Sequence, residues 1–112
     1  MFRVVFPTNE KLSYISTVDT TYDDAKYLTI LNLRGQNITD VEIVDNPYIN
    51  SKDTIAKISK ENGYAILFSP EGCSLPVEKL HEEGISVYKT SNKKTILQIY
   101  SDFVQDKLEK IA

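Results

Sequence analysis

The sequence has 112 residues, of which 41% are hydrophobic and 26% charged, as in ordinary globular domains. Lys and Arg number 13 against 16 Asp and Glu, and the net charge of −3 lacks the basic footprint of a protein whose main partner is nucleic acid. A single cysteine excludes an intramolecular disulfide, and no apolar run approaches the roughly 20 residues of a membrane helix. We expect one cytoplasmic domain over residues 1–112, with neither a membrane nor a nucleic-acid partner.

The N-terminal segment predicts a buried strand followed by a long connection. Phe2–Phe6 is apolar and β-branched and is bounded by Pro7, which is typical of a strand buried on both faces. Residues 8–26 are polar and follow no sustained period. We expect an ordered loop here, with a short strand near Tyr14-Ile15, and loops of this length are usually functional.

A β-hairpin follows. Tyr27–Leu33 and Ile38–Val44 alternate in side-chain character, and Arg34-Gly35-Gln36-Asn37 between them supplies Gly and Asn for a turn. After the hairpin, Ser51 is a candidate N-cap for a short helix with Ile55 and Ile58 on its apolar face.

The second half alternates between strands and helices. Tyr64–Phe68 reads as a central strand, and Ser74 as the cap of a helix that carries Val77 and Leu80, tolerates Pro76 in its first turn and ends at Gly84. Ile85–Tyr88 is the next strand. A last helix is predicted from apolar residues at helical spacing, with Lys107 and Lys110 at its C-terminal end. These apolar positions are Ile96, Tyr100, Phe103, Val104, Leu108 and Ile111.

This order predicts an α/β fold with one mixed sheet of about five strands and helices packed over it. The strand–helix–strand alternation indicates parallel strands joined by right-handed crossovers, and the hairpin adds an antiparallel pair.

Several phrases, in this order, resemble the dinitrogenase iron-molybdenum cofactor biosynthesis family, with its NifX- and NifB-type cofactor-binding domains. The phrases are Val4-Val5-Phe6-Pro7-Thr8, Ala25-Lys26-Tyr27-Leu28-Thr29-Ile30, Val41-Glu42-Ile43-Val44-Asp45-Asn46-Pro47, Ala65-Ile66-Leu67-Phe68 through Gly72, and Glu82-Glu83-Gly84-Ile85-Ser86-Val87-Tyr88. The resemblance implies a ribonuclease-H-like fold and a domain that carries iron–sulfur or molybdenum-containing clusters without catalysing a reaction. A protein that donates or accepts the cluster is the partner it implies.

The chain departs from this pattern where ligands are expected. The family commonly has His-Phe-Gly where this chain has Thr21, Tyr22 and Asp23, and often has His after the Asn-Pro phrase, where this chain reads Tyr48-Ile49-Asn50. Imidazole and thiolate suit the metals of such clusters, whereas Thr and Asn are poor substitutes. The resemblance therefore implies a cofactor-binding loop at residues 21–23 with a depleted ligand set.

Cys73 is the one candidate metal ligand with a local mechanism. With Gly72 and Ser74 it precedes the predicted helix, where backbone amides and the helix dipole would favour a thiolate. The plain alternative is a small, half-buried hydrophobe. We expect a labile iron–sulfur or molybdenum-containing cluster at Cys73, or no cofactor at all.

Other clusters point less clearly to chemistry. His81, the only histidine, follows Cys73 by about two helical turns and reads as a surface residue. Asp19, Asp23 and Asp24 suggest a two-metal nuclease only weakly, since the first strand carries no carboxylate. We therefore expect a binding domain and no enzyme. The alternative is a domain of the same fold that binds a protein or a small anion without a metal. In either case the functional face should join the Thr17–Ala25 loop to the Ser69–Ser74 loop.

Overall fold

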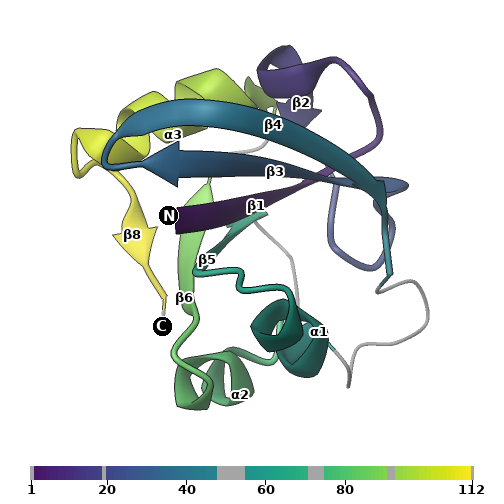
Figure 1. Ribbon diagram of the computed structural model, residues 1–112, viewed down its shortest axis with the longest axis vertical. Helices are drawn as coiled ribbons and strands as arrows, with labels where there is room; N and C mark the ends of the chain where they lie inside the picture. Colours follow the sequence, from purple (N-terminus) through teal and green to yellow (C-terminus); the bar gives the residue numbers. More distant parts are fainter. Residues whose placement is uncertain (1, 19, 48–54, 71–74, 91–92, 112) are drawn as a thin grey trace.

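A computed structural model describes residues 2–18, 20–47, 55–70, 75–90 and 93–111. Its strands form a six-stranded mixed sheet in the order β4-β3-β1-β5-β6-β8 and a two-stranded ribbon of β2 and β7 (Figure 1). The strands are β1 (Phe2–Thr8), β2 (Thr17–Val18), β3 (Tyr27–Arg34), β4 (Asn37–Asp45), β5 (Ile66–Pro70), β6 (Ser86–Thr90), β7 (Lys94–Thr95) and β8 (Glu109–Lys110). The predicted mixed α/β sheet is confirmed.

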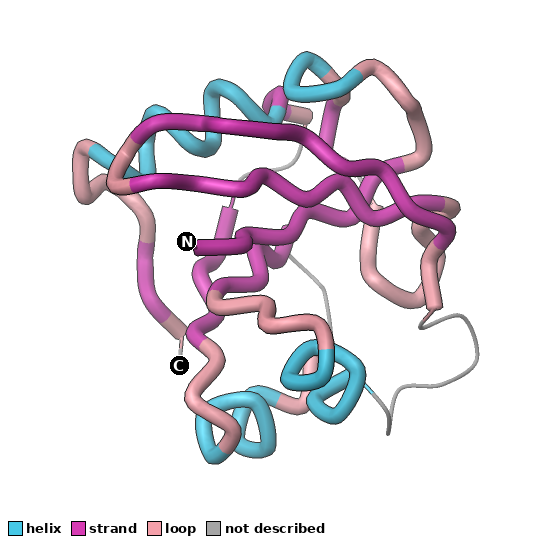
Figure 2. The backbone as a smooth tube through the Cα atoms, in the orientation of Figure 1, coloured by secondary structure: helices cyan, strands magenta, loops and turns pink. Residues whose placement is uncertain are grey.

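Helices cover both faces of the sheet (Figure 2). They are the 3₁₀ helix η1 (Ser13–Ile15) and the α-helices α1 (Ile55–Glu61), α2 (Val77–Glu82) and α3 (Ile96–Val104). On one face α1 and α2 bury Ile55 and Leu80 against Leu67 and Val87 of the sheet. On the other face α3 buries Ile96, Ile99 and Tyr100. No described helix is long and apolar enough to cross a membrane.

The first strand lies at the centre of the sheet, as its apolar sequence predicts. Val4, Val5 and Phe6 are fully buried. They alternate between the two cores, with Val5 under α1 and α2 and the other two under α3. β1 pairs antiparallel with β3 and parallel with β5. Both faces and both edges of β1 are therefore covered, which explains its unbroken apolar run.

The predicted hairpin is confirmed by antiparallel pairing of β3 with β4. Gly35 takes a φ of +65° in the turn, a conformation that glycine adopts without steric cost. The register shifts between Asn32 and Leu33, where Thr39 of β4 is the extra residue. Asp40–Asp45 then pairs regularly with β3.

The crossover from β5 through α2 to β6 is parallel, as predicted, and Gly84 ends α2 at a φ of +77°. The predicted start of α2 is wrong. The carbonyl of Pro76 accepts the amide of Leu80 at 3.0 Å, so Pro76 is the N-cap and the first helical residue is Val77. Proline suits this place because it has no amide to leave unpaired. Ser51 and Ser74, the predicted caps, lie outside the described residues.

The C-terminal helix is shorter than its periodicity predicts. α3 begins with a capping box between Thr95 and Gln98 but ends at Val104, and Asp106 turns the chain with a φ of +58°. The chain then pairs as β8 with β6. Lys107 and Lys110 therefore do not belong to the helix. Leu108 still packs against the core under α3, although it lies beyond the helix. Its position in the sequence happens to match the helical spacing, which is why the predicted helix was too long.

Between β1 and β3, the long predicted loop contains two short elements. Tyr14 and Ile15 belong to η1, so the strand predicted for them is wrong. The strand in this segment is β2, one step further along the chain, which pairs antiparallel with β7. β2 and β7 are each only two residues long, and strands this short leave almost no periodic signal in a sequence.

Candidate functional site

The carboxyl ends of the parallel strands β1, β5 and β6 lie at one edge of the sheet, which we call the carboxyl edge. It is formed by Thr8, Pro70 and Thr90 together with the segments that leave from them. β1 and β5 pair only at Val4–Ile66 and Val5–Leu67, so the two strands separate before they reach this edge. After β1 the chain forms β3 on one side of it, and later in the sequence it forms β5 on the other side. Open α/β sheets place ligands at such a switch point.

Tyr22 fills the place where β1 and β5 separate. Its side chain is fully buried, and its hydroxyl lies 3.1 Å from the carbonyl oxygen of Val5 and 2.8 Å from that of Phe68. The hydroxyl has one proton, so it donates to one of these two carbonyls at a time. Tyr22 thus attaches the segment 20–25 to the carboxyl edge.

Asn46 holds the same segment from the other side. Its Nδ2 group donates to the carbonyls of Tyr22 and Ala25 at 2.7 and 2.8 Å, and its backbone amide donates to Lys26. The residue is buried, so water does not readily replace it as the donor to these two carbonyls. Asn46 is a positioning residue that sequence reasoning did not single out, although it stands in the Asn-Pro phrase of the family resemblance.

Buried hydroxyls gather at the carboxyl edge. Thr8 and Thr29 share a hydrogen bond of 3.0 Å between their Oγ1 atoms, and the hydroxyl of Ser69 lies 3.3 Å from the Pro70 carbonyl. Thr90 is 2% exposed, and its Oγ1 has no hydrogen-bond partner among the described residues. An unsatisfied buried hydroxyl is costly, so Thr90 marks this edge as a place for a hydrogen-bonding group.

The predicted site residues of the 21–23 loop have different orientations. Tyr22 points into the core, while Thr21 and Asp23 are half-buried at the surface. The Thr21 hydroxyl donates to a carboxylate oxygen of Asp24 at 3.3 Å. Through the Tyr22–Phe68 hydrogen bond, the structure brings this loop to the end of β5, as the predicted functional face requires. Gly72, Cys73 and Ser74, the other half of that face, lie outside the described residues.

The atoms that could bind a metal at this edge are mostly oxygen atoms. Among the described residues no three His, Cys, Asp or Glu side chains are grouped to hold a metal ion. His81 is exposed in the last turn of α2, which leads to the start of β6 and so to the opposite edge. Asp23 and Asp24 lie on the loop, whereas Asp19 is outside the described residues. Hydroxyls and carboxylates are poor ligands for the soft metals of sulfide clusters.

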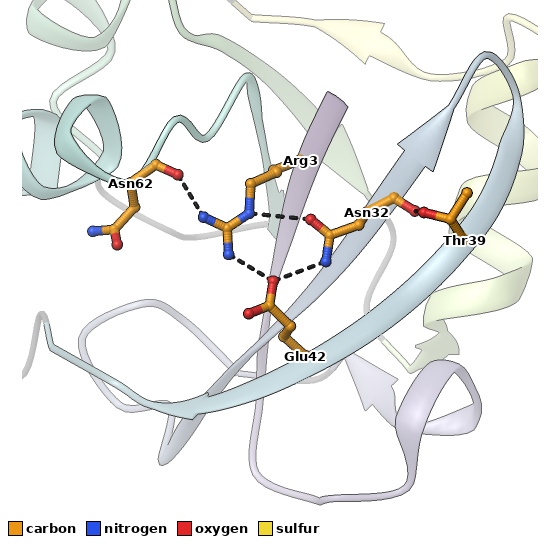
Figure 3. A network of polar contacts seen from close by, with 5 residues as sticks. All are labelled: Arg3, Asn32, Thr39, Glu42 and Asn62. Atoms are coloured by element: carbon orange, nitrogen blue, oxygen red, sulfur yellow. Dashed lines mark hydrogen bonds and ion pairs between the residues drawn. The ribbon is translucent and has the colours of Figure 1, made fainter. Parts of the chain in front are cut away.

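At the opposite edge, a network of polar side chains surrounds Arg3 (Figure 3). The Arg3 guanidinium donates to Asn32 at 3.1 Å and to Glu42 at 2.7 Å, and Asn32 also donates to Glu42 at 2.8 Å. A further guanidinium nitrogen donates to the Asn62 carbonyl, and the guanidinium lies 5.1 Å from the centre of the Tyr64 ring. This network ties β1, β3 and β4 to the turn before β5.

The hydrogen bonds to Glu42 change its acidity. The bond from Asn32 and then that from Arg3 hold the pKa of the Glu42 carboxyl below its ordinary value of 4.5. Burial raises the pKa of the Tyr64 phenol. Because the charges of this network satisfy one another, we read it as structural support for the sheet.

The comparisons with known proteins identify the family. The family described as "Dinitrogenase iron-molybdenum cofactor" matches residues 2–106, so the chain belongs to it. The resemblance found in the sequence phrases is confirmed. This family is associated with the biosynthesis and carriage of the iron-molybdenum cofactor. None of the curated proteins compared with the chain matches it.

Solved structures share the fold across almost the whole chain. The apo orange protein from Desulfovibrio gigas superposes with a TM-score of 0.80 at 17% identity, covering 100% of this chain and 94% of its own. A protein described as a candidate NifB from Thermotoga gives 0.76 at 22% identity, with 99% and 94% covered. A candidate dinitrogenase from Methanocaldococcus jannaschii gives 0.67 at 17%, with 98% and 94% covered. At these identities the likeness concerns the fold alone.

Proposed function

We propose that this protein is a non-enzymatic carrier that holds an iron–sulfur or molybdenum-containing cluster loosely at the carboxyl edge and passes it to a partner protein. The observation that carries the proposal is the family match over residues 2–106. The separated ends of β1 and β5 and the unpartnered hydroxyl of Thr90 support the choice of edge. The cluster is cargo here, so the chain needs no catalytic group.

The donor set fits a labile cargo better than a permanent one. Cys73 is the single thiol of the chain and is the metal ligand in this proposal. One thiolate holds a cluster weakly, because a tight site needs several soft ligands with supporting contacts. Hydroxyls such as that of Thr90, and the backbone near Gly72 and Ser74, would donate hydrogen bonds to the sulfides of the cluster.

The loop at residues 21–23 forms the opposite wall of the proposed site. Tyr22 and Asn46 fix its backbone by hydrogen bonds that any cargo leaves intact. Thr21 and Asp23 then line the loop in place of the family's histidine and glycine. Without an imidazole to bond the metal directly, exchange with a donor or acceptor protein is easy.

Anaerobic reconstitution with iron and sulfide tests the proposal. We expect the purified protein to be colourless, to take up a cluster with visible absorption, and to lose it on treatment with a chelator. The Cys73→Ser variant should take up none. A cluster that survives this substitution would show that other residues bind it. A cluster that resists the chelator in the wild type would contradict the weak donor set.

A metal-free role in binding a small anion is the second candidate. The unpartnered Thr90 hydroxyl favours it, because a buried hydroxyl donates equally well to an oxyanion. This candidate predicts no colour after reconstitution and a response to phosphate that does not depend on Cys73. The carrier proposal predicts the reverse of both results.

A further inference from the structure

The outer edge of β4 runs along the length of this strand and is distinct from the two edges formed by strand ends. It lies far from Cys73 in the sequence and takes no part in the proposed cluster site. β4 is the last strand on its side of the sheet, and among the described residues no strand pairs with its outer edge (Figure 1). It is also long, running from Asn37 to Asp45, whereas the strand at the other end of the sheet, β8, spans only Glu109–Lys110. Half of the backbone polar groups of an edge strand point away from the sheet and can pair with another chain.

Apart from one bulge, β4 protects its exposed edge only with acidic side chains, those of Asp40, Glu42 and Asp45. Asn37–Asp45 contains no Lys, Arg or Pro, and its one bulge lies near the turn, at Thr39. The regular segment Asp40–Asp45 remains available for pairing. The side chains of this segment are exposed or half-buried, and no described strand pairs with its outer edge.

Charge selects the partner. Asp40, Glu42 and Val44 share one face of β4. Glu42 is already paired with Arg3, whereas neither Asp40 nor Asp45 has an ion-pair partner among the described residues. Two β4 strands paired antiparallel about Val41 would place Asp40 opposite Glu42, and pairing about Glu42 would place the two glutamates opposite each other. Like charges directly opposite destabilise a strand pair. In any register a second copy would bring together two strands whose charged residues are all acidic, so it fits poorly, while Lys or Arg on the Asp40 face fits well.

An apolar surface lies on the other face of β4. The helix η1 packs against both β3 and β4. It and the residue before it expose large hydrophobic side chains: Leu12 is 50% exposed, Tyr14 42% and Ile15 58%. A strand added to β4 would present its alternate side chains toward this side of the sheet. These positions call for apolar residues.

We propose that the β4 edge binds an extended segment of a partner protein in which Lys or Arg alternates with β-branched apolar residues. The segment adds a seventh strand to the six-stranded sheet, with its basic side chains on the face of Asp40 and its apolar ones beside η1. Backbone hydrogen bonds supply affinity in this mode, and the alternate side chains supply specificity.

A synthetic peptide tests this proposal without any cluster. The probe is acetyl-Thr-Lys-Val-Lys-Val-Lys-Thr-amide, titrated into the isotopically labelled protein and followed by NMR. We expect shifts of the amides of Asp40–Asp45 and Ser13–Ile15, slower hydrogen exchange along β4, and weaker binding at high salt. A peptide with Glu in place of each Lys should not bind.

Three variants separate the contributions. Asp40→Lys should weaken binding about three- to tenfold and reduce its salt dependence. Ile15→Ser should weaken binding about threefold and leave the salt dependence unchanged. Glu109→Lys, which reverses an exposed charge on the other edge strand, should leave the affinity unchanged. The proposal is overturned if the basic peptide shifts no β4 amide, if Asp40→Lys and Glu109→Lys act alike, or if β4 signals shift with protein concentration alone, as pairing with a second copy would cause.

Discussion

The two edges of the sheet are stabilised in different ways. At the edge around Arg3, a charged and partly exposed network joins β1, β3 and β4, and each of its charges has a partner (Figure 3). At the carboxyl edge, neutral and buried groups hold a loop, through the Tyr22 hydroxyl and the Asn46 amide. This edge also keeps a buried hydroxyl, Thr90, without a described partner.

The comparison teaches where binding capacity remains in a small sheet. The Arg3 network consumes its own hydrogen-bonding groups, so a ligand there would have to break existing contacts. The carboxyl edge fixes its loop through two residues and, among the described residues, leaves the buried hydroxyl of Thr90 available. Rigid support beside an unused donor is the arrangement that a binding site needs.

The largest effect is expected from Asn46→Ala. This substitution removes two buried hydrogen bonds, those to the carbonyls of Tyr22 and Ala25, so the free energy of unfolding should fall by about 2–3 kcal/mol. Urea denaturation measures it. Asn37→Ala, at an exposed position, is the control and should cost far less. Equal losses in the two variants would mean that Asn46 does not hold the loop.

Tyr22→Phe should cost about 1–2 kcal/mol, because the ring stays buried while the Val5 and Phe68 carbonyls lose their donor. Hydrogen exchange should also become faster in residues 20–25 and remain unchanged around Arg3. Tyr14→Phe, at a residue that is 42% exposed, should have no such effect. Faster exchange at both edges would argue that the two networks are coupled.

A smaller effect should appear in acid at the Arg3 edge. The folded state lowers the pKa of Glu42 below 4.5, so ionised Glu42 stabilises the fold above that pH, and this contribution disappears as the pH falls through the lower, folded pKa. The stability difference between wild type and Glu42→Gln should therefore shrink below about pH 4.5.

Urea midpoints measured from neutral pH down to pH 3 give this difference directly. Glu109→Gln, at an exposed position of β8, serves as the control for the loss of a surface carboxylate. If the difference in stability between wild type and Glu42→Gln widened in acid, the expected effect would have the opposite sign. It would mean that the folded state favours the protonated carboxyl.

The smallest change in stability is expected for Cys73→Ser. Serine is nearly isosteric with cysteine, so unfolding by urea should differ by less than about 0.5 kcal/mol from the wild type. Cluster uptake, by contrast, should be abolished. A large loss of stability would instead assign Cys73 to a packed core.

The sequence predicted the sheet well where local patterns control it. The hairpin of β3 and β4 and the parallel pair of β5 and β6 followed from alternation and from the glycines at their turns. The predicted helix beyond Val104 was wrong because the positive φ at Asp106 and the pairing of β8 with β6 are decided by the rest of the fold. A helical spacing of apolar residues does not show whether they all belong to one helix or are shared with a following strand.

The candidate site was predicted in outline only. The loop around Tyr22 and the end of β5 do come together, but through a hydrogen bond between residues 46 positions apart, which no local pattern reveals. Asn46 acts over a similar range, since its partners lie 24 and 21 positions away. The position of Tyr22 between β1 and β5 could not be predicted, because a tyrosine in a polar segment does not indicate which strands it will contact.

The most direct test of the account is a map of which edge responds to a molybdenum–sulfur anion. Tetrathiomolybdate, which is diamagnetic, can be titrated into the labelled protein and followed through its amide signals. The account predicts shifts in residues 20–26, at Asn46 and at Thr90, with little change around Arg3. Shifts confined to the turn at Arg34–Asn37 would contradict it, because they would place the binding site at the opposite edge of the sheet.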